Sequence, residues 1–412
     1  MVLLKYNRHW EKGFKYPYTR KREIFNELLK HIEERQIVEV VGLRRTGKTT
    51  LLFQIINYLL EKGANPFSLC YFTFDEEMST IDGLLETFSH QTQMDFKNGK
   101  VYISLDEIQK LTDFQNQLKI YYDLYPNLKF FISGSTSLFI KKKTQESLAG
   151  RIISFFLPPL NFKEYLHFKE KEEILEKLSV FGQEIEKEFE MFLESQFIET
   201  INMKESAARK EYLISVIRKI IFEDIPRNFS VSNPEILWRI VQIVGQNPGI
   251  TIDYQGLSRE IGISNKTLSA YFFYLAESFL MKKIFNFSRN LLTSEKKLKK
   301  FYLASPSFSA AISDFIERGK LVENFVISLK DYRFFWRDAY KHEVDFISVE
   351  DKKIIPVEVK YKEKVSEKEL KNLFIFSKRF KPLKIILLSK ILEESRIKLK
   401  NIEIDQKPIY FI

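Results

Sequence analysis

The sequence predicts an α/β protein with a parallel sheet in its first part and a second α/β segment at its end. Up to about residue 159, strand-like apolar runs alternate with helical patterns, as they do when helices connect parallel strands. A glycine-containing loop follows the first of these runs, and strand-like runs return after about residue 330. The strands expected in the first part are Ile37–Val41, Ser68–Phe74, Val101–Leu105 and Lys129–Ile132.

The loop after the first strand matches the phosphate-binding pattern G-x-x-x-x-G-K-[ST] in full. An apolar strand leads into the loop and a helical pattern leads out of it, which is the setting that the pattern requires. The glycines let successive backbone N–H groups point at phosphate oxygens, and the helix presents its positive end to the same anion. The residues expected to bind the nucleotide are Gly42, Leu43, Arg44, Arg45, Thr46, Gly47, Lys48, Thr49 and Thr50.

Two members of this loop have a specific expected role. Lys48 is placed to reach the β- and γ-phosphates of ATP, and the Thr49 hydroxyl is placed to hold Mg²⁺. Arg44 and Arg45 lie inside the loop, where each is expected to contact phosphate or a neighbouring acid.

The third strand-like run ends in two carboxylates, Asp106 and Glu107. The carboxyl ends of parallel strands lie at the ligand-binding edge of a sheet. We therefore expect Asp106 to bind Mg²⁺ and Glu107 to polarise the water that attacks the γ-phosphate. The acidic pair favours ATP hydrolysis over simple nucleotide storage.

Ser133 and Arg151 each leave two interpretations open. Ser133 ends the fourth strand-like run, where it either senses the γ-phosphate or belongs to an ordinary Ser-Gly turn. Arg151 follows the next expected helix. It is either an arginine finger supplied to a neighbouring subunit of a homo-oligomer or an ordinary surface residue.

Charge is concentrated in the last third of the chain. The formal net charge is +10, and residues 288–412 hold 27 Lys and Arg against 18 Asp and Glu. A basic segment favours an anionic partner, most often DNA, although a lysine-rich solvated surface has the same composition. A single cysteine excludes a disulfide framework, and no apolar run approaches the ~20 residues of a membrane helix. The composition predicts a soluble, cytoplasmic protein without a membrane partner.

Beyond Pro158-Pro159 the pattern becomes helical and charged up to about Ser230. The next segment predicts a winged helix-turn-helix, a module that either reads the DNA major groove or contacts a protein. Its expected parts are the helices Pro234–Val244, Tyr254–Ile261 and Asn265–Ser278, the turn Gly262–Ser264 and the wing strand Met281–Phe287. A charged linker, Ser294–Lys300, is expected to follow.

The final segment predicts a nuclease-like order of a helix, three strands, a helix and a strand. Asp345 and Glu358 lie on neighbouring expected strands and supply oxygen atoms suited to Mg²⁺. Lys360 shares a strand face with Glu358, where it is placed to orient or deprotonate a metal-bound water that attacks a phosphodiester. The alternative is an edge strand with alternating charges.

These motifs together resemble prokaryotic AAA+-type P-loop ATPases that end in a domain of unknown function similar to PD-(D/E)XK nucleases. The segments that carry the resemblance are GLRRTGKTTLL, VYISLDEIQK, FISGSTS, SLAGR, EIGISNKTLSAYFFYLAESFLMKKI, YRFFWRD, EVDFI and PVEVK. The resemblance implies an ATPase core at residues 1–159 and a helical lid at 160–230. A winged helix-turn-helix at 231–288 and a restriction-endonuclease-like domain at 289–412 would follow.

The resemblance also implies roles for single residues. Glu323, Asp345, Glu358 and Lys360 occupy the nuclease-type positions. The family usually has Asp-x-Gly where this chain has Ser305-Pro306-Ser307, so a role carried by that Asp is absent here. The sequence thus predicts a Mg²⁺-dependent ATPase that acts on or near DNA through a binding or nucleolytic C-terminal domain. The alternative is a signalling ATPase whose C-terminal half binds a protein.

Overall fold

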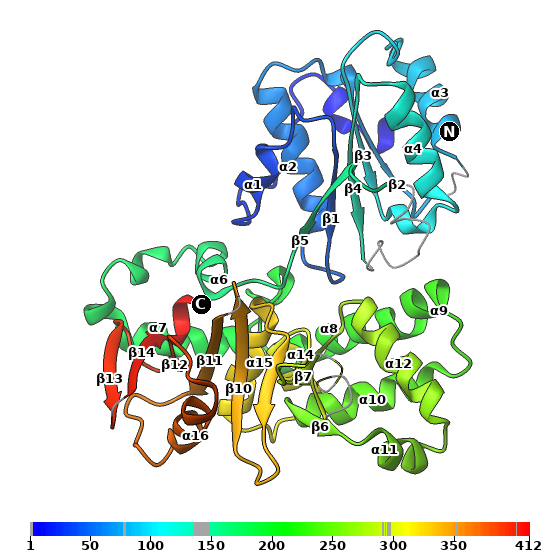
Figure 1. Cartoon of the computed structure of the whole chain (residues 1–412). Coiled ribbons are helices and arrows are strands. Elements are labelled where there is room, and N and C mark those ends of the chain that lie inside the picture. The colour runs from blue at the N-terminus through cyan, green and yellow to red at the C-terminus, as the bar shows by residue number, and fades with distance from the viewer. Residues whose placement is uncertain are drawn as a thin grey trace. The chain divides into compact units, whose positions relative to one another are not determined.

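The computed structural model describes residues 3–76, 80–135, 148–290, 292, 294, 298–351, 353–400 and 402–412 (Figure 1). The chain forms two compact units, residues 1–158 and 159–412, each described by itself below. The passage between them falls at Pro158-Pro159, where the sequence pattern breaks. Parts of three predicted segments lie outside the described residues, namely 136–137 of FISGSTS, 147 of SLAGR and 295–297 of the linker. Within the described chain, no helix is long and apolar enough to cross a membrane.

The first unit is built on a parallel sheet with the strand order β2-β3-β4-β1-β5. Its strands are β1 (Ile37–Val41), β2 (Leu69–Thr73), β3 (Val101–Asp106), β4 (Leu128–Gly134) and β5 (Ile152–Phe156). Its helices are α1 (Phe25–Leu29), α2 (Lys48–Glu61), α3 (Ile81–Thr92) and α4 (Phe114–Leu124). The four predicted strands are present with small shifts at their ends.

The fifth strand, β5, is absent from the prediction. It pairs with β1 from Ile37↔Ile152 to Val41↔Phe156 and forms one edge of the sheet. A short apolar run that ends in prolines gives no local signal of the strand it will join, because pairing is set by the topology of the whole sheet. β1 is buried along its whole length, and the apolar side of α2 packs over it through Leu51, Leu52 and Ile55.

The second unit is built on a mixed sheet with the strand order β13-β14-β12-β11-β10-β9-β7-β8-β6. Its strands are β6 (Ile250–Ile252), β7 (Met281–Asn286), β8 (Lys299–Leu303), β9 (Phe334–Arg337), β10 (Glu343–Glu350), β11 (Lys353–Lys360), β12 (Ile386–Ser389), β13 (Ser395–Leu399) and β14 (Ile402–Pro408). Its helices are α6 (Phe162–Phe168), α7 (Leu178–Leu193), α8 (Ser206–Lys219), α9 (Ile225–Asn228), α10 (Pro234–Gln246), α11 (Tyr254–Ile261), α12 (Asn265–Glu277), α14 (Pro306–Ile312), α15 (Arg318–Leu329) and α16 (Lys371–Phe380). The first half of this unit is therefore mostly helical, as predicted.

The strands on either side of residue 288 belong to one sheet. β7 pairs with β8 in antiparallel register and with β9 in parallel register. The predicted linker is wrong at its end, because Lys299 and Lys300 begin β8. Burial of the Lys300 amine inside the sheet is tolerated because Glu323 and Glu343 neutralise it. The four-part domain division stays a prediction.

Two apolar clusters pack against this sheet. One joins α15 to α6 and α7 and includes Phe325, Phe335 and Val357. The other contains α16 residues together with Trp336 and Ile347. α15 and α16 thus pack on the sheet through separate apolar clusters.

Candidate functional site

Both glycines of the phosphate-binding loop occupy positions that a side chain would disturb. A Cβ on Gly42 would lie 2.4 Å from the Leu157 carbonyl oxygen, because the loop passes directly against the chain that follows β5. Gly47 has φ +97° and forms the N-cap of α2, a conformation that favours glycine. The loop therefore curls into the start of α2, as its sequence predicts.

Lys48 and Arg22 interact with the backbone of this loop. The buried Lys48 amine donates to the carbonyl oxygens of Gly42 and Leu43 at 3.1 and 3.0 Å. Arg22 is 5% exposed and donates to the carbonyl oxygens of Thr46 at 2.8 Å and Pro158 at 2.9 Å. One guanidinium thus fastens the loop to the last residue of the unit.

Asp106 lies at the carboxyl end of β3 and accepts from three side chains. Thr49 donates at 2.6 Å and Tyr71, from β2, at 2.9 Å, while Ser133 donates to the other carboxylate oxygen. The strand order explains this meeting, because β4 lies between β3 and β1 and brings Ser133 beside Asp106. Burial and then the Asp106 charge raise the pKa of Tyr71, so its hydroxyl stays a donor.

Glu107 continues this edge of the sheet in a left-handed conformation, φ +53°. Its backbone N–H donates to the Ser133 hydroxyl at 3.2 Å. Its carboxylate accepts from Gln109 and from Ser135, the latter at 3.2 Å. Ser133 therefore contacts both members of the acidic pair and fixes their relative position.

The other predicted residues of this unit are placed as follows. Arg44 and Thr50 are half-buried, and Arg45 is exposed with φ +67°. Arg151 lies before β5, at the amino end of the sheet, and forms a two-pronged ion pair with Asp123 at 2.9 and 3.1 Å. A strand of this length separates it from the loop by about 15 Å, so Arg151 is not part of its own chain's nucleotide site.

The donor set suits Mg²⁺-bound ATP. Phosphates are bound by groups of the kind present here, namely the backbone N–H groups of a glycine-containing loop, the Lys48 amine and the N-terminus of α2. The adjacent oxygens of Thr49 and Asp106 are ligands that Mg²⁺ prefers. When bound, the metal would neutralise charge on the phosphates, and Glu107 would hold the attacking water.

The second unit contains a buried cluster of acids and lysines. Lys300 is 1% exposed and forms ion pairs with Glu323 at 3.0 Å and Glu343 at 2.6 Å. Glu323 also pairs with Lys320 at 2.8 Å and accepts from Tyr302. Burial alone would raise the pKa of Glu323, but the two lysines outweigh it and hold that pKa at about 2.

Asp345, Glu358 and Lys360 form the other half of the cluster. Asp345 accepts from the Val359 N–H at 2.9 Å, and Lys360 pairs with Glu358 at 2.6 Å, which confirms that the two residues share a face. Burial raises the pKa of both acids, and the Asp345 charge adds to the shift at Glu358. Burial alone would lower the pKa of Lys360. The charges of the two acids outweigh burial and raise that pKa, so this side chain stays an ammonium.

The cluster fits a metal ion only in part. Among the described residues, no group of three or more His, Cys, Asp and Glu side chains is arranged to hold a metal. One buried oxygen, Oε2 of Glu358, nevertheless accepts no hydrogen bond within the described chain. A protonated Lys360 suits the orienting role predicted for it better than proton removal.

The three helices and the strand predicted for this segment are present as α10, α11, α12 and β7, and β7 lies between β8 and β9 in the nine-stranded sheet. The winged helix-turn-helix module itself stays a prediction. Ser264 caps α12 by accepting from the Thr267 N–H at 3.0 Å. Asn265, Lys266 and Ser269, on the first turns of α12, are exposed. These polar side chains are thus available for contact.

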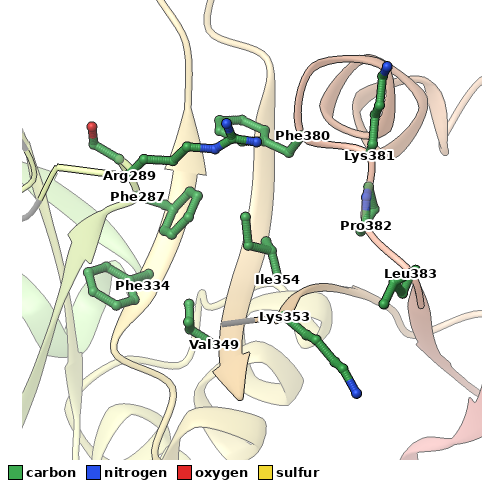
Figure 2. A pocket seen from close by; sticks show the side chains of 11 residues that line it. Phe287, Arg289, Phe334, Val349, Lys353, Ile354, Phe380, Lys381, Pro382 and Leu383 are labelled. Atoms are coloured by element: carbon green, nitrogen blue, oxygen red, sulfur yellow. The ribbon is translucent and has the colours of Figure 1, made fainter. Parts of the chain in front are cut away.

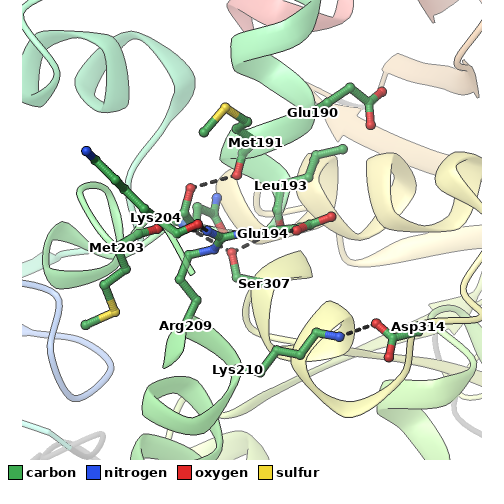
Figure 3. A network of polar contacts seen from close by, with 12 residues as sticks. Glu190, Met191, Leu193, Glu194, Met203, Lys204, Arg209, Lys210, Ser307 and Asp314 are labelled. Carbon is green, nitrogen blue, oxygen red and sulfur yellow. Dashed lines mark hydrogen bonds and ion pairs between the residues drawn. The ribbon is translucent and has the colours of Figure 1, made fainter. Parts of the chain in front are cut away.

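The segment that replaces Asp-x-Gly ties helices together. Ser305 caps α14 and donates to Gln196 at 2.7 Å. Ser307 donates to the Leu193 carbonyl at 3.0 Å and accepts from the Gln196 N–H at 2.9 Å (Figure 3). Nearby, Lys210 of α8 pairs with Asp314. The serines therefore have structural contacts in place of the absent acid.

The sequence analysis missed three residues of these sites, Arg22, Tyr71 and Lys300. Each reaches its partner through tertiary pairing and not through a local motif. Lys300 carried a misleading signal, since it stands in a lysine-rich run that predicts a linker. A lysine at the start of an apolar run, Phe301-Tyr302-Leu303, was the available sign of a buried strand.

Three family models match the chain. The AAA domain matches residues 34–166, and two domains of unknown function, DUF8612 and DUF4143, match residues 192–318 and 318–405. The chain therefore contains an AAA-family P-loop domain followed by two domains of unknown function. This class of domain implies nucleotide binding, typically of Mg²⁺-bound ATP.

The chain is also similar to individual proteins. An uncharacterized protein of Methanocaldococcus jannaschii is 28% identical over 377 residues, 85% of this chain and 80% of that protein. An uncharacterized protein of Haemophilus influenzae is 24% identical over 400 residues, 91% of this chain and 95% of that protein. AMPPCP-bound DnaA from Aquifex aeolicus aligns with a TM-score of 0.30 at 16% identity, over 65% of this chain and 90% of that chain. A TM-score this low supports no inference about function.

Proposed function

We propose that this protein is a Mg²⁺-dependent ATPase that acts as a switch on DNA. The observation that carries the ATPase assignment is the contact between Thr49 and Asp106 at 2.6 Å, with Glu107 next along the chain. A phosphate loop, a metal-binding pair and a water-holding carboxylate then lie at one edge of the sheet.

Each side chain has a distinct task in the proposed reaction. Lys48 exchanges its bonds to the loop carbonyls for bonds to the phosphates. Thr49 and Asp106 hold the metal, and Ser133 keeps Asp106 and Glu107 in position. Glu107 orients the water for attack in line with the leaving oxygen.

Two substitutions test the ATPase assignment. Lys48→Ala should abolish ATP binding, whereas Glu107→Gln should retain binding and lose turnover by at least a hundredfold. Phosphate release and binding of a fluorescent ATP analogue measure the two effects, with the exposed Lys12→Ala as the control. Wild-type turnover in Glu107→Gln would remove this residue as the water activator.

The proposed action on DNA rests on charge and on α12. Residues 288–412 carry 27 basic against 18 acidic side chains, and the first turns of α12 present exposed polar groups. Phosphate contacts predict an affinity that falls steeply as salt rises. A titration of duplex and single-stranded DNA across salt concentrations tests this, and absence of binding would favour the protein-contact alternative.

DNA cleavage is a second candidate function for the C-terminal segment. The observation in its favour is the unsatisfied, buried Oε2 of Glu358 beside Asp345 and Lys360. Cleavage should require Mg²⁺ or Mn²⁺ and vanish in Asp345→Ala and Glu358→Ala. Cleavage that persists in the double variant would place the chemistry elsewhere, and an inactive wild type would leave a binding module.

We further propose that Arg151 acts in trans, at the nucleotide of a neighbouring subunit. Its distance from its own loop and its pairing with the half-exposed Asp123 are compatible with that role. Mixing Arg151→Ala with Lys48→Ala protein should then restore part of the ATPase activity. Absence of rescue, or a monomer in the presence of ATP, contradicts the proposal.

A further inference from the structure

A pocket of about 500 Å³ lies at one end of the nine-stranded sheet (Figure 2). Its apolar part contains phenyl rings and aliphatic side chains that come from the ends of four strands, from α16 and from the segment after α16. They are Phe287, Phe334, Val349, Ile354, Phe380 and Leu383. A pocket of this volume falls in the range that small ligands occupy.

The pocket lies beside the C-terminal end of α16. The helix ends at Phe380, and the next residue, Lys381, turns away with φ +50°. Phe287, Phe334 and Phe380 belong to the apolar cluster that packs with α16, yet Phe334 and Phe380 stay partly exposed. Apolar surface is thus left open where the helix no longer covers it.

Three cations surround this apolar floor, and no carboxylate lines it. They are Arg289, Lys353 and Lys381, and none forms an ion pair within the described chain. Figure 2 shows Lys353 and Lys381 pointing outward and Arg289 reaching toward Phe380. The guanidinium lies 6.0 Å from the Phe380 ring centre. The site therefore suits a ligand with a flat apolar part and an anionic part.

We propose that this pocket binds one unpaired nucleotide of single-stranded DNA. The base enters among the phenyl rings, and the flanking phosphates lie at Arg289, Lys353 and Lys381. Aromatic rings combined with a basic rim are the features by which proteins bind single strands without sequence preference. The inference rests on the proposed action on DNA. It adds that single-stranded DNA is the form that binds at this end of the sheet.

A neighbouring pocket favours a continuous DNA strand, and not a single free nucleotide, as the ligand. A second pocket of about 380 Å³ lies across the ridge formed by Lys381, Pro382 and Leu383, which line both pockets. Phe374 and Lys378 line the second pocket, together with one carboxylate, Glu403. Under this proposal, the two hollows take two successive bases, and the phosphate between them lies at Lys381.

Substitution of the cations tests the proposal. Arg289→Ala/Lys353→Ala should weaken binding of a fluorescent oligothymidine at least tenfold. It should also reduce the slope of log affinity against log salt by about 1.4, since each single-strand contact contributes roughly 0.7. The matched control is Lys364→Ala/Lys368→Ala, which removes two exposed lysines from the segment that precedes α16.

A ring substitution tests the stacking independently of charge. Phe380→Leu keeps an apolar side chain and should weaken oligothymidine binding about fivefold without changing the salt slope. Phe411→Leu, at an exposed phenyl ring elsewhere in the unit, should leave binding unchanged. Circular dichroism verifies that each variant is folded.

The outcomes separate this inference from the proposed function. If wild-type protein binds DNA but both pocket variants bind equally well, the pocket assignment fails and the action on DNA stands. If wild type binds no DNA, both fail. Binding of phosphatidylglycerol vesicles without oligothymidine binding would overturn the proposal in favour of a lipid.

Discussion

Arg22 fixes the phosphate-binding loop through hydrogen bonds to backbone carbonyl oxygens. Its two donors reach the carbonyl oxygens of Thr46 and Pro158, so one planar side chain joins two segments distant in sequence. Hydrogen bonds from a charged group contribute about 1.5–3 kcal/mol each. A lysine cannot reproduce this fork, because it offers a single point charge.

We therefore predict that Arg22→Lys weakens ATP binding about tenfold and lowers the stability of the first unit by about 2 kcal/mol. Titration with a fluorescent ATP analogue and urea unfolding measure the two effects. Lys12→Ala, at an exposed position of the same unit, serves as the control. An affinity equal to wild type would mean that the loop keeps its shape without the guanidinium.

Glu39 makes the first unit sensitive to pH. It lies buried in β1, where Ser154 donates to one carboxylate oxygen and the other accepts no hydrogen bond within the described chain. Burial raises its pKa to about 7, and the Ser154 hydrogen bond offsets only part of that shift. Between about pH 4.5 and 7 the folded protein holds a proton that the unfolded chain has released, so stability falls as pH rises.

Glu39→Gln should remove this dependence. The neutral amide resembles the protonated acid, so the variant should match wild type near pH 4.5 and exceed it at pH 8 by up to about 3 kcal/mol. Urea unfolding at several pH values measures the difference. The exposed Glu33→Gln should leave the pH profile unchanged, and a profile unaltered in Glu39→Gln contradicts the assignment.

Among the elements, β5 and the phosphate loop depend on each other. The Leu157 N–H donates to the Val41 carbonyl at 2.8 Å, and the Leu157 carbonyl leaves no room for a side chain on Gly42. Gly42→Ala should therefore displace the loop, abolish ATP binding and lower stability by about 1–3 kcal/mol. Gly319→Ala, where a Cβ meets open space, is the control for the added methyl group. Retained ATP binding in Gly42→Ala would show that the chain after β5 moves to make room for the added methyl group.

Elements whose pattern is local were predictable, and those that depend on pairing were not. The loop of residues 42–50 and the end of β3 are each defined by consecutive residues, so the sequence located Lys48 and Asp106. β5 and β8 are as long as the predicted strands β1 and β2, but their places follow from which strand lies next to them. Lys300 can lie buried in β8 because Glu323 and Glu343, which are distant in sequence, neutralise its charge.

Over the whole molecule, the connection between the two units starts at the nucleotide site. Leu157 contacts the loop, Pro158 accepts from Arg22, and the second unit begins one residue later. A change in the loop on ATP binding would thus reach the second unit through a short, proline-containing segment. If ATP alters DNA affinity by some factor, DNA must alter ATP affinity by the same factor.

This connection gives the last prediction. In the Glu107→Gln background, which is expected to bind ATP without turnover, ATP should change the affinity for oligothymidine at least fivefold. The typical coupling of 1–3 kcal/mol between sites sets this scale. Insertion of a Gly-Ser-Gly-Ser segment between Pro158 and Pro159 should abolish the change while both ligands still bind, because a flexible linker transmits no displacement. Anisotropy titrations with and without ATP measure it. Coupling that survives the insertion would show that the units communicate through another route.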